Sequence, residues 1–205
     1  MMTEVGASSP STGSGTGLRD EPFEPEVVRS DIAFAGRVWD IRSETFRYGD
    51  EELTREYMDH PGAAAILALD DEGRVLLIQQ YRHPIRHRDW ELPAGLLDVP
   101  GEAPVEAAKR ELAEEADLEA EHWEPLVAHF PTPGGCNEVI HIFLATGLRP
   151  AAVAHDREAE EADMRLEWVP LSDAADAVLD GRMRNGVLAL GVLAAERRAG
   201  ARRGA

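Results

Sequence analysis

The chain has 205 residues with 43% hydrophobic content, which suits one domain of moderate size or a domain with an appended subdomain. Its formal charge of −18 argues against a general affinity for nucleic acid or for an anionic membrane surface. No apolar run approaches the roughly 18 residues that span a bilayer, no secretory signal pattern is present, and the single cysteine excludes an internal disulfide framework. These features favour a cytoplasmic protein.

The N-terminal part is expected to hold a tail followed by a small β subdomain. Residues 1–24 are rich in Ser, Thr, Gly and Pro, a composition typical of a disordered tail. Apolar residues alternate within residues 25–59, and Tyr48-Gly49-Asp50 is a turn signal between two strands. A hairpin of this size is marginal alone, so it must pack on the main domain or on another subunit.

The main domain is predicted over residues 60–199, followed by a short tail at residues 200–205. Strands are expected at residues 63–69, 74–80, 126–130, 139–146 and 164–169. A helix is expected at 173–179 with Ser172 as its N-cap, and an amphipathic helix at 185–198. The pattern predicts an α/β fold with a mixed sheet between helices and a small antiparallel β subdomain at the N-terminus.

The most informative segment is a further predicted helix that begins near Ala103, since Pro104 is acceptable only in a first turn. Glu111 and Glu115 lie one turn apart on one face of this helix, and Glu114 lies on the adjoining edge. Like charges at this spacing destabilise an isolated helix, so a positive group is expected against the face. Carboxylate oxygens suit Mg²⁺, with Mn²⁺ as a substitute. The alternative interpretation is a solvated acidic helix.

Three loops add candidate contacts for a phosphorylated ligand. Arg82 begins a cationic cluster, and a guanidinium fits phosphate in a bidentate way, although a solvated basic loop is the alternative. The loop at 131–138 is stiffened by prolines and opened by glycines, and an ordinary hairpin connection is its alternative interpretation. The long segment at 150–163 carries several carboxylates, and a carboxylate there can act as general base to an attacking water.

The segment around the acidic helix resembles the signature of the Nudix hydrolase family. The matching residues are Gly95, Glu102, Arg110, Glu111, Leu112, Glu114, Glu115 and Leu118. The chain departs from the family pattern in two places. Six residues, not five, separate Gly95 from Glu102, and Asp117 stands where a glycine is expected. Neither departure removes a carboxylate, and an aspartate can adopt the left-handed conformation that ends a helix.

The resemblance implies a Nudix fold over about residues 60–172 and a metal site beside the acidic helix. The implied magnesium ligands are the Ala94 carbonyl, Glu111 and Glu115, with Glu114 sharing or supporting a metal. Arg110 is expected to orient the glutamates through ion pairs, and Glu102 to ligate an additional metal or to brace the loop.

The branch of the family that hydrolyses ADP-ribose supplies further expectations. It keeps arginines at positions that match Arg82 and Arg55. The Pro-Gly loop that ends at Glu138 resembles the substrate loop of sugar-nucleotide Nudix enzymes, and Glu138 is expected to contact the ribose or the nucleoside. Its catalytic glutamate precedes the last strand. Glu160 is the first choice for that role and Glu161 the second.

The expected activity is therefore hydrolysis of ADP-ribose to AMP and ribose 5-phosphate. The expected assembly is a homodimer whose N-terminal sheets lend residues to the partner's site. Another sugar nucleotide, coenzyme A or a nucleoside triphosphate remains an alternative substrate. A non-catalytic ligand-binding module is the alternative outside enzymes, and the full set of Glu111, Glu114 and Glu115 argues against it.

Overall fold

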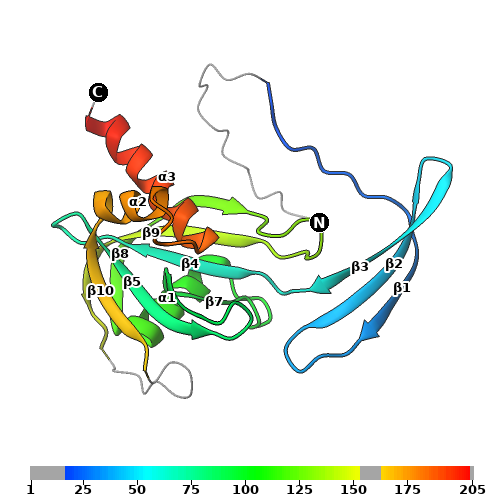
Figure 1. Ribbon diagram of the computed structural model, residues 1–205, viewed down its shortest axis with the longest axis horizontal. Helices are drawn as coiled ribbons and strands as arrows, with labels where there is room; N and C mark the ends of the chain where they lie inside the picture. Colours follow the sequence, from blue (N-terminus) through cyan, green and yellow to red (C-terminus); the bar gives the residue numbers. More distant parts are fainter. Residues whose placement is uncertain (1–16, 153–162, 204–205) are drawn as a thin grey trace, which may run out of the picture.

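Three β-sheets and three helices make up the regular structure of the residues that the computed structural model describes, 17–152 and 163–203 (Figure 1). The first strands are β1 (Val27–Phe34), β2 (Asp40–Tyr48), β3 (Glu51–Asp59), β4 (Ala63–Ala68) and β5 (Arg74–Arg82). The later strands are β6 (His87–Glu91), β7 (Ala94–Leu96), β8 (Leu118–His129), β9 (Ile140–Pro150) and β10 (Arg165–Pro170). The helices are α1 (Pro104–Ala116), α2 (Leu171–Leu179) and α3 (Gly186–Arg203).

The main body confirms the predicted α/β fold, with a mixed sheet between helices. Its sheets have the strand orders β7-β4-β9-β8 and β10-β5-β6, and β4 pairs with β9 in parallel. Alternate residues of a strand face opposite ways. Ala63 and Leu67 therefore belong to the core shared with α2 and α3, whereas Ala64 and Ile66 belong to the core shared with α1. Because helices cover both faces, every residue of β4 is buried.

The N-terminal sheet is antiparallel, in the order β1-β2-β3, and projects from one side of the main body (Figure 1). The predicted hairpin is thus part of a three-stranded sheet. All eight residues of β1 are exposed, among them Val27, Ile32 and Phe34. An apolar edge strand in solvent is unusual, because such edges tend to pair or to be covered.

The end of β3 is bonded to the loop at 131–138. The Met58 N–H donates to the Gly135 carbonyl at 2.9 Å, and the His60 N–H donates to Oδ1 of Asn137 at 2.8 Å. The Asn137 amide in turn donates to Asp59, which also accepts Nε and Nη2 of Arg42 at 2.8 and 2.6 Å. These bonds make the N-terminal sheet and the loop one connected unit.

Helix α1 begins and ends as its sequence predicts. Ala103 is the N-cap residue and Pro104 occupies the first turn, where its missing N–H leaves no helical bond unmade. Asp117 ends the helix in the left-handed conformation, with φ 53° and ψ 36°, and its N–H donates to the Ala113 carbonyl at 3.1 Å. An aspartate therefore performs the turn for which the family pattern has a glycine.

Other element boundaries differ from the prediction. Strand β8 begins directly after α1 at Leu118, although residues 118–125 read as polar. It pairs with β9 along almost its whole length, and polar side chains suit the exposed face of such a pair. Ser172 is not a cap, because Pro170 holds the N-cap position of α2 and the Ser172 hydroxyl donates to Asp173.

Helix α3 runs to Arg203, beyond the predicted end at residue 198. At its start, Oδ1 of Asn185 accepts the N–H groups of Val187 and Leu188, both at 3.0 Å, and so caps the helix. Within the described part of the chain, no helix has the length and apolar character needed to cross a bilayer.

Candidate active site

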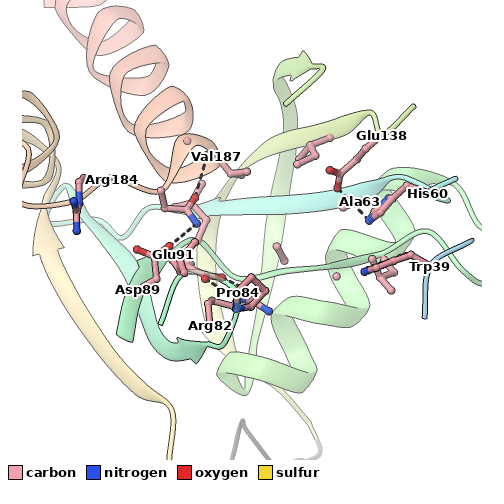
Figure 2. Close-up of a pocket in the computed structure, with 18 residues that line it drawn as sticks. Trp39, His60, Ala63, Arg82, Pro84, Asp89, Glu91, Glu138, Arg184 and Val187 are labelled. Atoms are coloured by element: carbon pink, nitrogen blue, oxygen red, sulfur yellow. Dashed lines mark hydrogen bonds and ion pairs between the residues drawn. The ribbon is translucent and has the colours of Figure 1, made fainter. Parts of the chain in front are cut away.

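A pocket of about 640 Å³ opens where β6, β7 and the start of α3 meet. Its lining residues are Trp39, His60, Ala63, Arg82, Pro84, Ile85, Asp89, Glu91, Leu92, Ala94, Gly95, Leu96, Glu138, Ile140, Arg184, Asn185, Gly186 and Val187. Figure 2 shows Trp39, His60 and Glu138 on one side of this pocket and Asp89 and Arg184 on the other. A volume of this size suits a small-molecule ligand.

The acidic helix α1 lies against β7, whose residues line this pocket. Oε2 of Glu115 accepts the Ala94 N–H at 2.9 Å, and the Glu115 side chain is buried. Glu111 lies so close to Gly95 that a Cβ there would be 2.0 Å from Oε1 of Glu111, which explains why the position is a glycine. The β7 backbone at residues 94–95 therefore separates two carboxylates from the pocket by a single layer of backbone.

Arg110 holds the carboxylates of this helix in place. Its Nη1 contacts Oε1 of Glu111 at 2.5 Å and Oε2 of Glu114 at 3.1 Å, and its Nη2 is 3.3 Å from Oε2 of Glu102. Partial burial opposes the charge of the guanidinium, but hydrogen bonds and charges from Glu102 and Glu111 outweigh it and raise the pKa of Arg110. As predicted, Arg110 pairs with the glutamates, and Glu102 braces the loop through it.

The donor chemistry of this cluster fits a hard divalent cation. Three carboxylates surround one guanidinium, so the group keeps a net negative charge, and carboxylate and carbonyl oxygens are the ligands that Mg²⁺ prefers. Within residues 17–152 and 163–203, no group of three or more His, Cys, Asp or Glu side chains converges as a ready-made metal site. Arg110 occupies the positive position that the sequence assigned to a cation.

Arg82 lies on the wall of the same pocket, where Glu91 holds it. Nε of Arg82 donates to Oε1 of Glu91 at 2.8 Å, and Nη2 donates to Oε2 at 2.7 Å. Gln80 donates to the same carboxylate at 3.3 Å. Glu91 is only 6% exposed, so this bidentate pair fixes the direction of the Arg82 guanidinium.

An aromatic surface forms one end of the pocket. The rings of Trp39 and His60 stack with centroids 4.2 Å apart and an interplanar angle of 26°. Nδ1 of His60 accepts the Gly62 N–H at 3.0 Å, so Nε2 faces Glu138 Oε1, 3.5 Å away. The structure thus brings Glu138 to the pocket beside a flat surface on which a nucleobase can stack.

The other predicted site residues lie elsewhere. Arg55 lines a separate depression with Tyr57 and the loop around Cys136, and it does not line the main pocket of its own chain. Glu160 and Glu161 lie outside the described residues. Glu114 is placed beside Arg110 rather than on the pocket wall.

Sequence reasoning missed several residues that line the pocket. The missed polar and aromatic residues are Trp39, His60, Asp89, Glu91, Arg184 and Asn185. Period-two alternation could have identified Asp89 and Glu91, because acidic residues two apart in a strand share one face. No local signal marks Trp39 or Arg184, which reach the pocket only through tertiary packing.

Comparisons with known proteins agree with this arrangement. The NUDIX domain model matches residues 58–189. The chain is 43% identical over 170 residues to an ADP-ribose pyrophosphatase of Mycobacterium tuberculosis, with 82% of each protein covered. It is 34% identical over 158 residues to an ADP-ribose pyrophosphatase of Bacillus subtilis, covering 76% of this chain and 84% of that protein. A crystal structure of an ADP compounds hydrolase has a similar fold, with a TM-score of 0.73 at 19% identity, covering 90% of this chain and 98% of the other.

Proposed function

Because the chain belongs to the NUDIX family, we propose that it hydrolyses ADP-ribose at the diphosphate to give AMP and ribose 5-phosphate. The observation that carries the proposal is the contact between α1 and β7 at residues 94–95. This contact sets Glu111 and Glu115 directly behind the wall of a pocket that also holds Arg82. Two relatives named ADP-ribose pyrophosphatase support the choice of substrate.

The proposed metal ligands are the Ala94 carbonyl, Glu111 and Glu115, with Glu114 as a supporting ligand. Bound Mg²⁺, or Mn²⁺ in its place, would neutralise the diphosphate and acidify a coordinated water. Arg110 keeps Glu111 oriented through its ion pair.

The chain's own residues supply the remaining steps. Arg82, held by Glu91, donates to a phosphate oxygen, and its fixed direction lowers the entropy lost on binding. The nucleobase stacks at the Trp39 end, where Glu138 accepts hydrogen bonds from the ribose. Glu160, or Glu161 in its place, accepts the proton of the attacking water.

We also propose that the protein works as a homodimer in the cytoplasm. A second copy would cover the exposed apolar residues of β1, which a lone chain leaves in water. The same arrangement would carry Arg55 to the partner's pocket, since Arg55 belongs to the sheet that projects away from its own. A single cysteine suits a reducing compartment.

The test is a hydrolysis assay of the full-length protein with Mg²⁺ against ADP-ribose, other sugar nucleotides, coenzyme A and nucleoside triphosphates. ADP-ribose should give the highest kcat/KM, with AMP and ribose 5-phosphate identified by chromatography. A higher kcat/KM for another substrate would replace ADP-ribose. Binding of ADP-ribose without turnover in excess Mg²⁺ would instead identify a ligand-binding module.

A further inference from the structure

The two ends of the pocket differ in chemistry. Trp39 and His60 are the aromatic side chains among its described lining residues, and both lie at one end. The opposite end presents a carboxylate and a guanidinium from Asp89 and Arg184 (Figure 2), and the Asn185 carboxamide, which is hydrogen-bonded to Asp89. Among the described lining residues, aromatic rings on which a nucleobase can stack lie at the first end alone, which leaves the second end to the other half of a ligand.

The second end is built by joining two segments that are distant in sequence. His87 and Asp89 share one face of β6, since they are two residues apart. Nη2 of Arg184 lies 3.0 Å from Nε2 of His87, and the Asn185 amide donates to Oδ2 of Asp89 at 3.1 Å. Asn185 also caps α3, so these contacts fix the start of that helix against β6.

The hydrogen-bond pattern around His87 determines the charge of this end. Nδ1 of His87 lies 2.6 Å from the Ile85 carbonyl and donates to it, which leaves Nε2 as the acceptor for Arg184. A neutral imidazole does not cancel a guanidinium charge. Among the described residues, no carboxylate forms an ion pair with Arg184, whose side chain is exposed, so none of these residues cancels its charge.

Asp89 retains acceptor capacity as well. Its described side-chain hydrogen bond uses Oδ2 alone, and a carboxylate has about four acceptor positions. A carboxylate and a guanidinium that line the same end of a pocket suit sugar hydroxyl groups, because hydroxyls can donate to Asp89 and accept from Arg184. A phosphate suits the pair poorly, since Asp89 would repel it. A ligand tail without hydroxyl groups also suits Asp89 and Arg184 poorly, since both side chains would lose bound water without gaining a hydrogen-bond partner.

We infer that Asp89 and Arg184 bind the hydroxyl groups of an uncharged sugar attached to the nucleoside diphosphate. This inference rests on the proposed function and makes the two residues determinants of specificity. They favour diphosphates that end in a free sugar over nucleoside triphosphates and coenzyme A. Asp89 and Arg184 select the leaving half of the substrate, whereas Trp39 and Glu138 contact the nucleoside.

The test compares the affinities of ADP-ribose and ADP by titration calorimetry, without divalent cations so that turnover does not interfere. Arg184→Gln and Asp89→Asn should each raise the Kd of ADP-ribose about tenfold, while the Kd of ADP changes less than twofold; tenfold corresponds to about 1.4 kcal/mol. Arg182→Gln is the matched control, because Arg182 lies in the same connection but pairs with Asp180 outside the pocket. It should leave both affinities unchanged.

Two outcomes would overturn the inference. An unchanged Kd of ADP-ribose in both variants would show that neither side chain contacts the sugar. If the Kd of ADP rises as much as the Kd of ADP-ribose in both variants, the two side chains contact the nucleotide half or act through long-range charge. The wild-type hydrolysis assay separates this inference from the proposed function. If the wild type binds ADP-ribose without cleaving it, the proposed hydrolase activity is refuted. The calorimetric comparison still decides the role of Asp89 and Arg184.

Discussion

Oε2 of Glu115 accepts the backbone N–H of Ala94 at 2.9 Å, and this bond joins the buried face of α1 to β7, which lines the pocket. A helix placed this way can deliver carboxylates to a ligand without exposing them to bulk water. Charged groups interact more strongly in such a site than at an open surface.

Glu115→Gln should lower kcat for ADP-ribose hydrolysis by about 100-fold or more, because a neutral amide is a poor ligand for Mg²⁺. The melting temperature should stay close to wild type, since an amide oxygen can still accept the Ala94 N–H. The matched control is Glu106→Gln on the same helix, where Glu106 is exposed and pairs with Lys109. Near-normal turnover of Glu115→Gln at saturating Mg²⁺ would refute the metal assignment.

Gly95→Ala should damage the site more than the fold. The added Cβ would lie 2.0 Å from Oε1 of Glu111, so the Glu111 carboxylate must move away from β7. Displacement of a catalytic group by about 1 Å lowers kcat/KM by roughly 10- to 100-fold. Gly134→Ala is the control, because a Cβ at Gly134 meets no atom within 4 Å. Equal kcat/KM values for the two variants would contradict this account of Gly95.

Glu160→Gln should reduce kcat by about 100-fold or more while leaving the KM for ADP-ribose within a few-fold of wild type, as expected for a general base. The Kd of ADP-ribose, measured without divalent cations, should not change. If Glu161→Gln alone shows this pattern, the register of the loop assignment is wrong by one residue. If neither variant loses activity, the base is a residue other than Glu160 or Glu161.

Asp59→Asn should destabilise the protein at neutral pH but not in acid. Hydrogen bonds from Arg42 and Asn137 hold the pKa of Asp59 below its ordinary value of 3.8. Because the folded pKa is depressed, the stabilisation is complete above pH 3.8 and is lost as the pH falls through the folded value. At pH 7 the variant should melt roughly 2–4 °C lower, for a loss of about 1 kcal/mol.

Melting curves at several pH values check the Asp59 prediction. The difference between wild type and Asp59→Asn should persist down to about pH 5 and shrink below the ordinary pKa of a carboxyl group. Asp50→Asn is the control, since Asp50 lies in the exposed turn between β2 and β3. A difference that does not change with pH would mean that packing, not ionisation, stabilises this position.

Phe34→Asp should convert the proposed dimer into monomers. Phe34 is 65% exposed on β1, and a charge there would be buried without a partner in any interface formed by this strand. Light scattering should report half the wild-type mass, and hydrolysis should weaken because Arg55 no longer reaches a partner. Leu179→Asp is the control, because Leu179 is exposed at the end of α2. A wild type that is monomeric at assay concentrations would rule out the dimer.

Local patterns predicted the elements whose determinants are local. The start of helix α1 followed from Pro104, and the left-handed turn at Asp117 followed from the properties of aspartate. The resemblance to the family then supplied roles for these residues. The position of Arg82 beside the pocket was predicted from the residue type and its place after a strand.

Long-range contacts determine what the sequence did not reveal. The start of β8 at Leu118 depends on pairing with β9, and a polar stretch carries little sign of that pairing. Ser172 fits a helix cap by type, but α2 begins at Leu171 and Pro170 already holds its N-cap position. The end of the pocket lined by Asp89 and Arg184 requires the start of α3 to meet β6, which no window of sequence around Arg184 can show.

The bonds between β3 and the loop at 131–138 have a mechanical consequence. Met58 and Gly135 share a backbone hydrogen bond, and Asn137 is tied to both Asp59 and His60. Any tilt of the N-terminal sheet must therefore shift the backbone that carries Glu138. A molecule that binds β1 and tilts this sheet would also displace Glu138 at the Trp39 end of the pocket. Self-association through β1 and affinity for the ligand should therefore be coupled.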